Sequence, residues 1–168
     1  DSLSSGEFEA KNEKGEHTYH DMYEYSWGQY IARMCGSKVY NFSRGGMTAE
    51  EYCKSFADEK DFWNPEYASQ AYIIALGVND ILGQKNPVGS IDDVDFSDWH
   101  NNTQNFAGYY AQIIQRMKEI QPRAKFFLMT MLRDGENDRN PQGKQEHRKL
   151  LYGFSEKFDN TYVLDLLE

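Results

Sequence analysis

The sequence predicts an α/β protein in which helices cover both faces of a parallel β-sheet. Apolar runs of strand length recur along the chain, and segments with apolar residues at helical spacing lie between them. This alternation of strand and helix is typical of parallel strands joined by crossover helices. A chain of 168 residues can bury a substantial core, so we expect one domain over residues 1–168.

The first third of the chain is predicted to hold one helix and one short strand. Residues 1–21 are polar and Gly-rich, which indicates a strand-to-helix turn followed by a surface loop. Residues 22–35 carry apolar side chains at helical spacing, and Gly36 supplies the C-terminal stop. Residues 38–41 form a short β-rich run, and a Gly-containing turn over residues 42–47 follows it.

The middle of the chain is organised around residues 71–76, a continuous apolar run that enters the turn Gly77-Val78-Asn79-Asp80 directly. A fully buried parallel strand has this character, and ligands bind at the carboxyl ends of such strands. Before it, Thr48 and Glu51 predict a capping box for a helix that reaches about residue 59. After it, residues 81–100 indicate a long loop.

The last third is predicted to hold two helices and two strands. Residues 101–121 show a strong helical stripe, which ends before Pro122. Residues 125–132 form another buried strand and lead into a polar loop. A helix over residues 141–158 and a final strand over residues 161–165 complete the alternation.

The composition excludes several classes of partner and cofactor. The net charge is −9 and the pI is about 4.9, which argues against a basic nucleic-acid-binding surface. No apolar run approaches the ~18 residues that a membrane span requires. Cys35 and Cys53 have no Cys or His at ligand spacing, so we expect no metal site. The sequence does not indicate the oligomeric state.

Three turns that leave predicted strands carry residues suited to acyl transfer. They are Asp1-Ser2, Ser43-Arg44-Gly45-Gly46 and Gly77-Val78-Asn79-Asp80. If successive parallel strands are neighbours, these turns share one crevice. Acyl transfer needs a nucleophilic oxygen and donors aimed at the oxyanion, and a Ser at a helix N-terminus, a Gly amide and an Asn carboxamide can supply them.

These turns resemble three motifs of the GDSL/SGNH hydrolase family. Asp1-Ser2-Leu3 resembles the Gly-Asp-Ser-Leu block without its leading Gly, residues 41–48 resemble the second block, and residues 77–80 resemble the third. The blocks occur in the family's order. The resemblance covers residues 1–168 and implies a flavodoxin-like three-layer α/β/α sandwich with a parallel central sheet, and it implies no cofactor.

The resemblance also implies a role for each matched residue. Ser2 becomes the nucleophile, and the oxyanion is held by the Ser2 amide, the Gly46 amide and the Asn79 side chain. The supporting residues around this site are Asp1, Gly77 and Asp80, of which Asp80 fixes the third turn. Structural interpretations remain open for each block: Ser2 as a helix N-cap, residues 45–46 as a flexible turn, and Asn79 as a turn former.

The sequence departs from the family in its fourth block, an Asp-x-x-His that supplies the base. No Asp-x-x-His occurs in the chain, and we expect this block and a first strand to lie outside residues 1–168. The histidines are His17, His20, His100 and His147. We expect all of them to be surface residues, with His147 on the solvated side of its helix; His100 is the best placed because its loop leaves the catalytic edge.

The sequence therefore predicts a serine esterase that acts through an acyl-Ser intermediate. An acidic, aromatic-rich composition favours a short-chain acyl ester of a carbohydrate as substrate. Because acyl-sugar substrates are usually found outside the cytoplasm, we expect the protein there as well. The alternative is a non-catalytic carbohydrate-binding or structural module that kept the fold and lost the base. A nucleotide-binding domain is disfavoured because the chain contains no Gly-rich phosphate loop.

Overall fold

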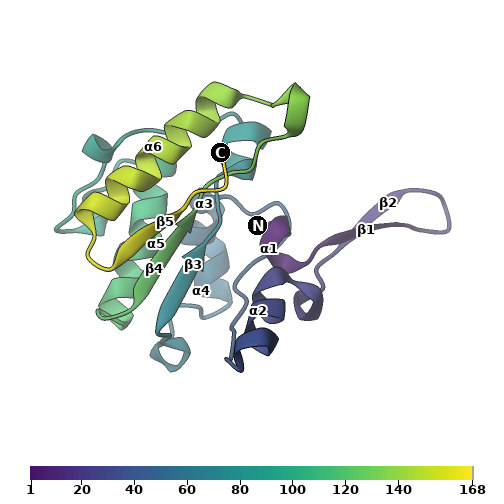
Figure 1. Ribbon diagram of the computed structural model, residues 1–168, viewed down its shortest axis with the longest axis horizontal. Coiled ribbons are helices and arrows are strands. Elements are labelled where there is room, and N and C mark those ends of the chain that lie inside the picture. The colour runs from purple at the N-terminus through teal and green to yellow at the C-terminus, as the bar shows by residue number, and fades with distance from the viewer. Residues whose placement is uncertain (168) are drawn as a thin grey trace. The chain divides into compact units, whose positions relative to one another are not determined.

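The computed structural model describes residues 1–167, which divide into two compact units. The first unit runs from Asp1 to Met47, and the second begins at Thr48. Each unit has its own secondary structure, as Figure 1 shows. None of the helices within residues 1–167 is long and apolar enough to cross a membrane.

The first unit contains a short helix, a hairpin and a longer helix. In chain order its elements are α1 (Ser2–Ser5), β1 (Phe8–Lys11), β2 (His17–His20), a 3₁₀ turn (Tyr23–Tyr25) and α2 (Trp27–Cys35). Helix α2 starts later than the sequence predicts because the Ser26 hydroxyl accepts from the Gln29 amide and caps it. Gly36 ends α2 in the left-handed conformation with a φ of 65°, as predicted.

A β-hairpin replaces the surface loop that the sequence predicts after α1. Strands β1 and β2 pair antiparallel, with Phe8 opposite His20, and extend away from α1 in Figure 1. The turn is stabilised by the Asn12 side chain, which accepts from the amides of Lys14 (2.9 Å) and Glu16 (3.0 Å). The prediction was wrong because each strand has only four residues and β2 is mostly polar, so the apolar alternation of Phe8 and Ala10 in β1 is too short to be recognised.

The strand predicted over residues 38–41 does not form. These residues adopt no regular secondary structure. Asn41, the last of them, instead uses its side chain to donate to the Ser4 carbonyl oxygen (2.8 Å) and to the Ser26 hydroxyl (3.1 Å). Residues with high β propensity are therefore not enough to form a strand here, because a strand also needs a neighbouring strand to which its backbone can hydrogen-bond.

The second unit is built on a three-stranded parallel sheet. Strand β4 (Lys125–Met129) lies between β3 (Ala71–Ile74) and β5 (Thr161–Leu164). Its main helices are α5 (Phe106–Ile120) and α6 (Pro141–Lys157). The shorter elements are α3 (Ala49–Glu51), a π-helical segment (Tyr52–Phe56), α4 (Ala57–Glu59), a second π-helical segment (Val78–Gly83), and 3₁₀ turns at Pro65–Tyr67, Ile91–Asp93, Trp99–Asn101 and Gly135–Asn137.

The core of the second unit lies between one face of this sheet and the two long helices. Phe126 and Leu128 of β4 are fully buried on that face. Tyr110 of α5 stacks on Phe154 of α6 at 5.7 Å between ring centroids, so the two helices are neighbours. The opposite face carries Ile73, which is exposed. The α/β class with a parallel sheet is thus confirmed.

Side-chain caps set the helix starts in this unit. Thr48 Oγ1 accepts from the Glu51 amide at 3.1 Å, which confirms the Thr48 half of the capping box predicted at the start of α3. Asn105 Oδ1 accepts from the Gly108 amide at 3.0 Å, so α5 begins at Phe106 rather than near residue 101. Helix α6 begins at Pro141, as predicted, because Pro is well suited to the first helical position.

Candidate active site

Ser2 occupies the first position of α1, and Asp1 caps the helix. The Asp1 carboxylate accepts from the Leu3 amide at 3.1 Å, and its carbonyl oxygen accepts from the amides of Ser4 and Ser5, both at 3.0 Å. Asp1 is buried and Ser2 is partly exposed. The capping role therefore falls to Asp1, which removes the N-cap interpretation of Ser2.

Asp21 connects α1 to the turn that contains Gly46, a connection that the sequence analysis missed. The Ser5 hydroxyl donates to the Asp21 carboxylate, and the Gly45 amide donates to the same carboxylate at 3.1 Å. Ser5 Oγ also lies 3.3 Å from the Ser2 carbonyl oxygen. A polar residue in a polar segment gives no sequence signal, because only the fold shows what it contacts.

The two glycines of this turn are required for different reasons. A Cβ atom at Gly45 would lie 1.7 Å from the Glu7 carboxylate, so a side chain there would force the Glu7 side chain to move. Gly46 has open space around it but a φ of 71°, a backbone conformation that L-residues rarely adopt. The Gly46 amide is therefore presented by a left-handed turn anchored through Asp21.

The third turn leaves β3 through a second left-handed glycine. Gly77 has a φ of 129°, and its carbonyl oxygen accepts from the Ile81 amide at 2.8 Å. The Asn79 carbonyl oxygen accepts from the Gln84 amide at 2.8 Å, five residues further on. This wide π-helical turn carries Asn79 at the carboxyl end of the sheet, the edge that the sequence predicts.

Asp80 fixes the third turn to the start of α3. Its side chain is only 1% exposed, and its carboxylate accepts from the Ala49 amide at 3.0 and 3.3 Å. Burial raises the Asp80 pKa to about 6, and the hydrogen bond from Ala49 opposes this shift. The contact agrees with the turn-fixing role that the resemblance implies for Asp80.

The prediction that His147 lies on the solvated side of its helix was wrong. His147 is fully buried, and its Nε2 atom lies 3.0 Å from the Leu76 carbonyl oxygen. The prediction assigned charged and polar residues of α6 to its solvated side. The buried face of α6 nevertheless includes the polar residues Lys144 and His147 beside Leu151 and Phe154. Burial lowers the His147 pKa to about 4, so the ring is neutral near pH 7.

The other three histidines are exposed, as predicted. His17 pairs with Glu9 across the hairpin, and His20 hydrogen-bonds Thr18 at 3.0 Å. His100 pairs with Asp98 in its own turn, at 2.6 Å between Nδ1 and the carboxylate.

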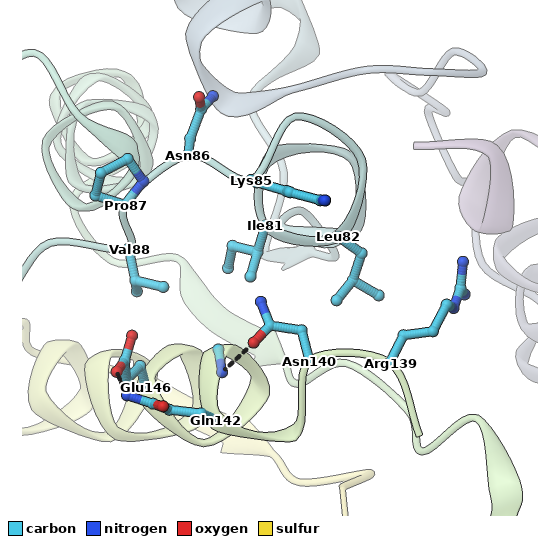
Figure 2. Close-up of a pocket in the computed structure, with 11 residues that line it drawn as sticks. Ile81, Leu82, Lys85, Asn86, Pro87, Val88, Arg139, Asn140, Gln142 and Glu146 are labelled. Atoms are coloured by element: carbon cyan, nitrogen blue, oxygen red, sulfur yellow. Dashed lines mark hydrogen bonds between the residues drawn. The ribbon is translucent and has the colours of Figure 1, made fainter. Parts of the chain in front are cut away.

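A pocket of about 570 Å³ opens beside the third turn within the second unit. Figure 2 shows Ile81, Leu82 and Val88 facing Asn140 and Gln142 across it. Its lining residues are Ile81, Leu82, Lys85, Asn86, Pro87, Val88, Arg139, Asn140, Gln142, Gly143 and Glu146. Apolar side chains form one side of this space, and polar side chains of the loop before α6 and of α6 itself form the other.

An ion cluster holds the loop between β4 and α6 that borders this pocket. The Lys144 ammonium is fully buried and pairs with Asp138 and with Asp134, the latter at 3.1 Å. Arg139 pairs with Asp134 at 2.8 Å. Hydrogen bonds from Arg139 and Lys144 lower the Asp134 pKa. The cluster fixes the loop from which Asn140 enters the pocket wall.

The six predicted site residues are divided between the two units. Asp1, Ser2 and Gly46 belong to the first, and Gly77, Asn79 and Asp80 belong to the second. Within the first unit, Asp21 connects the helix of Ser2 to the turn of Gly46. Within the second, Asn79 and Asp80 share one turn. Their catalytic roles stay predictions.

Comparison with known proteins identifies one family. The model of the family described as GDSL-like Lipase/Acylhydrolase matches residues 1–162 and so runs through both units. No curated protein sequence matches the chain significantly.

Two solved structures share the fold. The first, described as a possible lipase from Chitinophaga pinensis DSM 2588, has a TM-score of 0.59 and 21% identity over 82% of this chain. The second crystal structure has a TM-score of 0.57 and 19% identity over 98% of this chain. The match spans 56% of the first structure's chain and 74% of the second's.

Proposed function

Because the chain belongs to the GDSL-like lipase/acylhydrolase family, we propose that it hydrolyses carboxylic esters through an acyl intermediate on Ser2. The observation that carries this proposal is the family match over residues 1–162, which includes the Ser2 block and the Asn79 turn. Ser2 Oγ attacks the ester carbonyl carbon and gives up its proton to a base. The tetrahedral intermediate then expels the alcohol, which takes a proton, and water hydrolyses the acyl-Ser bond.

The oxyanion of both tetrahedral intermediates is held by three donors in this proposal. Ser2 stands at the first helical position, where an amide makes no intrahelical hydrogen bond. Gly46 presents its amide from a left-handed turn, and Asn79 offers its carboxamide from the turn after β3. Backbone amides and Asn side chains stabilise such oxyanions in acyl transfer, and loss of one donor costs about 3–4 kcal/mol of barrier.

A fluorophosphonate probe tests whether Ser2 is an activated nucleophile. We expect the complete native gene product to react with the probe and peptide mapping to find the label on Ser2. A hydroxyl at its ordinary pKa is a poor nucleophile, so labelling requires a base and oxyanion donors. Absence of labelling in the folded, full-length protein would contradict the proposal and favour a binding module. A label on another residue would exclude Ser2 as the nucleophile.

The proposed substrate is a short-chain acyl ester of a carbohydrate. The support is the composition: the chain is acidic, and Phe, Trp and Tyr make up 15% of it. Aromatic side chains suit sugar rings, which present apolar C–H faces beside polar hydroxyl groups, because Tyr and Trp combine an apolar ring with a polar atom. We expect faster turnover of acetylated oligosaccharides and p-nitrophenyl acetate than of p-nitrophenyl palmitate. Robust hydrolysis of the palmitate with no hydrolysis of acetyl esters would refute this substrate class.

A further inference from the structure

His147 lies directly behind the turn that carries Asn79. The last residue pair between β3 and β4 is Ile74 and Leu128. The backbone from Ala75 to Asn79 therefore lies beyond the ladder that joins these two strands. Two buried side chains contact carbonyl oxygens at this end of the strand. The Tyr110 hydroxyl donates to the Ile74 carbonyl oxygen at 3.1 Å, and His147 Nε2 lies 3.0 Å from the Leu76 carbonyl oxygen.

The hydrogen bond fixes the tautomer of His147. A carbonyl oxygen can only accept, so Nε2 carries the proton and donates it to Leu76. Nδ1 is buried and has no hydrogen-bond partner among the residues that the structure describes. The rings of Phe106 and Tyr110 lie 5.5 and 6.4 Å from the imidazole between centroids. The ring is therefore a neutral donor with one polar contact, to the backbone before Gly77.

The imidazole also fits against Gly77 itself. A Cβ atom at Gly77 would lie 2.9 Å from His147 Nε2 and 3.0 Å from its Cδ2 atom. The carbonyl oxygen of Gly77 accepts a hydrogen bond from the Ile81 amide, and this bond closes the turn around Asn79. The His147 side chain thus contacts the Leu76 carbonyl oxygen and also fills the space beside the Gly77 Cα atom, two residues before Asn79.

We propose that His147 is a positioning residue for Asn79, which it aligns through the hydrogen bond from its Nε2–H to the Leu76 carbonyl oxygen. The inference rests on the proposed function, in which the Asn79 carboxamide binds the oxyanion. A shift of ~1 Å in such a donor can reduce the rate by as much as ~100-fold. His147 does not touch the reacting atoms, because it is fully buried behind the turn.

The test compares two substitutions in the complete native protein. His147→Gln keeps an amide donor that can reach the Leu76 carbonyl oxygen, whereas His147→Phe fills the space without a donor. We expect kcat for p-nitrophenyl acetate to fall ~10-fold or more in His147→Phe and less than ~3-fold in His147→Gln, with KM little changed. Tyr110→Phe is the matched control, since it removes a buried donor at Ile74; its kcat should stay near the wild-type value.

A double-mutant cycle separates positioning from general destabilisation. If His147 acts through Asn79, then His147→Phe should cost almost nothing further in an Asn79→Ala background. An equal loss of kcat in both backgrounds, or an equal loss in His147→Gln and His147→Phe, overturns the inference.

An NMR measurement distinguishes failure of this inference from failure of the proposed function. If the wild-type protein hydrolyses no ester through Ser2, the proposed function fails. The side-chain amide resonances of Asn79 then decide the inference without activity. They should move in His147→Phe and stay close to wild type in His147→Gln and Tyr110→Phe. Unchanged Asn79 resonances in His147→Phe overturn the positioning role.

Discussion

Replacing Ser2 by alanine should lower kcat for ester hydrolysis by the complete native protein by roughly 10⁴-fold or more. The size follows from other serine hydrolases, in which loss of the nucleophile costs up to ~10⁶-fold and leaves only catalysis by the oxyanion donors. Ser2→Ala should leave α1 intact, because the cap is supplied by Asp1. The measurement is steady-state hydrolysis of p-nitrophenyl acetate, with fluorophosphonate labelling lost in parallel.

Ser4→Ala is the matched control for this substitution. Ser4 lies in the same short helix, and its hydroxyl is buried with no hydrogen-bond partner among the described residues. Removing that hydroxyl should change kcat less than ~2-fold, since within the part of the chain that the structure describes it breaks no hydrogen bond that could hold Ser2 in place. Activity that survives Ser2→Ala within ~10-fold of wild type would exclude Ser2 as the nucleophile.

Asp80→Asn and His147→Gln should change the pH dependence of stability in opposite directions between about pH 4 and 6. The folded-state pKa of Asp80 is about 6 against an ordinary value of 3.8, so Asp80 stabilises the fold at low pH and this contribution is lost as the pH rises. The folded-state pKa of His147 is about 4 against 6.5, so its contribution is present above pH 6.5 and lost as the pH falls. In the wild-type protein the two contributions cancel over much of this range.

Each substitution removes one of these opposing contributions. As the pH rises from 4 to 6, the free energy of unfolding of Asp80→Asn should increase by about 2–3 kcal/mol more than that of the wild-type protein, because only the His147 contribution remains. That of His147→Gln should decrease by a similar amount over the same range. Urea denaturation at several pH values measures both. Parallel profiles for all three proteins would show that neither group titrates with a shifted pKa.

The parts of the fold that the sequence predicts are those in which burial leaves a simple apolar pattern. Strand β4 buries Phe126 and Leu128, so its apolar run reflects its burial. Strand β3, which the sequence predicts to be fully buried, exposes Ala71 and Ile73 and buries only Ile74, so its apolar run identifies the strand correctly and overstates its burial. The Thr48 cap and the Gly36 stop are local, so the residues themselves identify them. These elements needed no knowledge of long-range contacts.

The parts that the sequence did not predict depend on contacts between distant residues. His147 is polar and lies near charged residues of α6, yet its partner is a carbonyl 71 residues away in the chain. Asp21 acts through Ser5 and Gly45, which are 16 and 24 residues away. The β1–β2 hairpin is closed by the Asn12 side chain rather than by apolar packing. Local propensity and periodicity carry no information about such contacts.

The π-helical turn after β3 limits where the chain tolerates insertions and deletions. The Gln84 amide donates to the Asn79 carbonyl oxygen, five residues earlier, at 2.8 Å. The Asn86 amide donates to the Asp80 carbonyl oxygen at 2.9 Å. Removing one residue between Gly77 and Gln84 would rotate the following side chains by about 100° around the helix axis. Length variation among relatives should therefore be rare between Gly77 and Gln84.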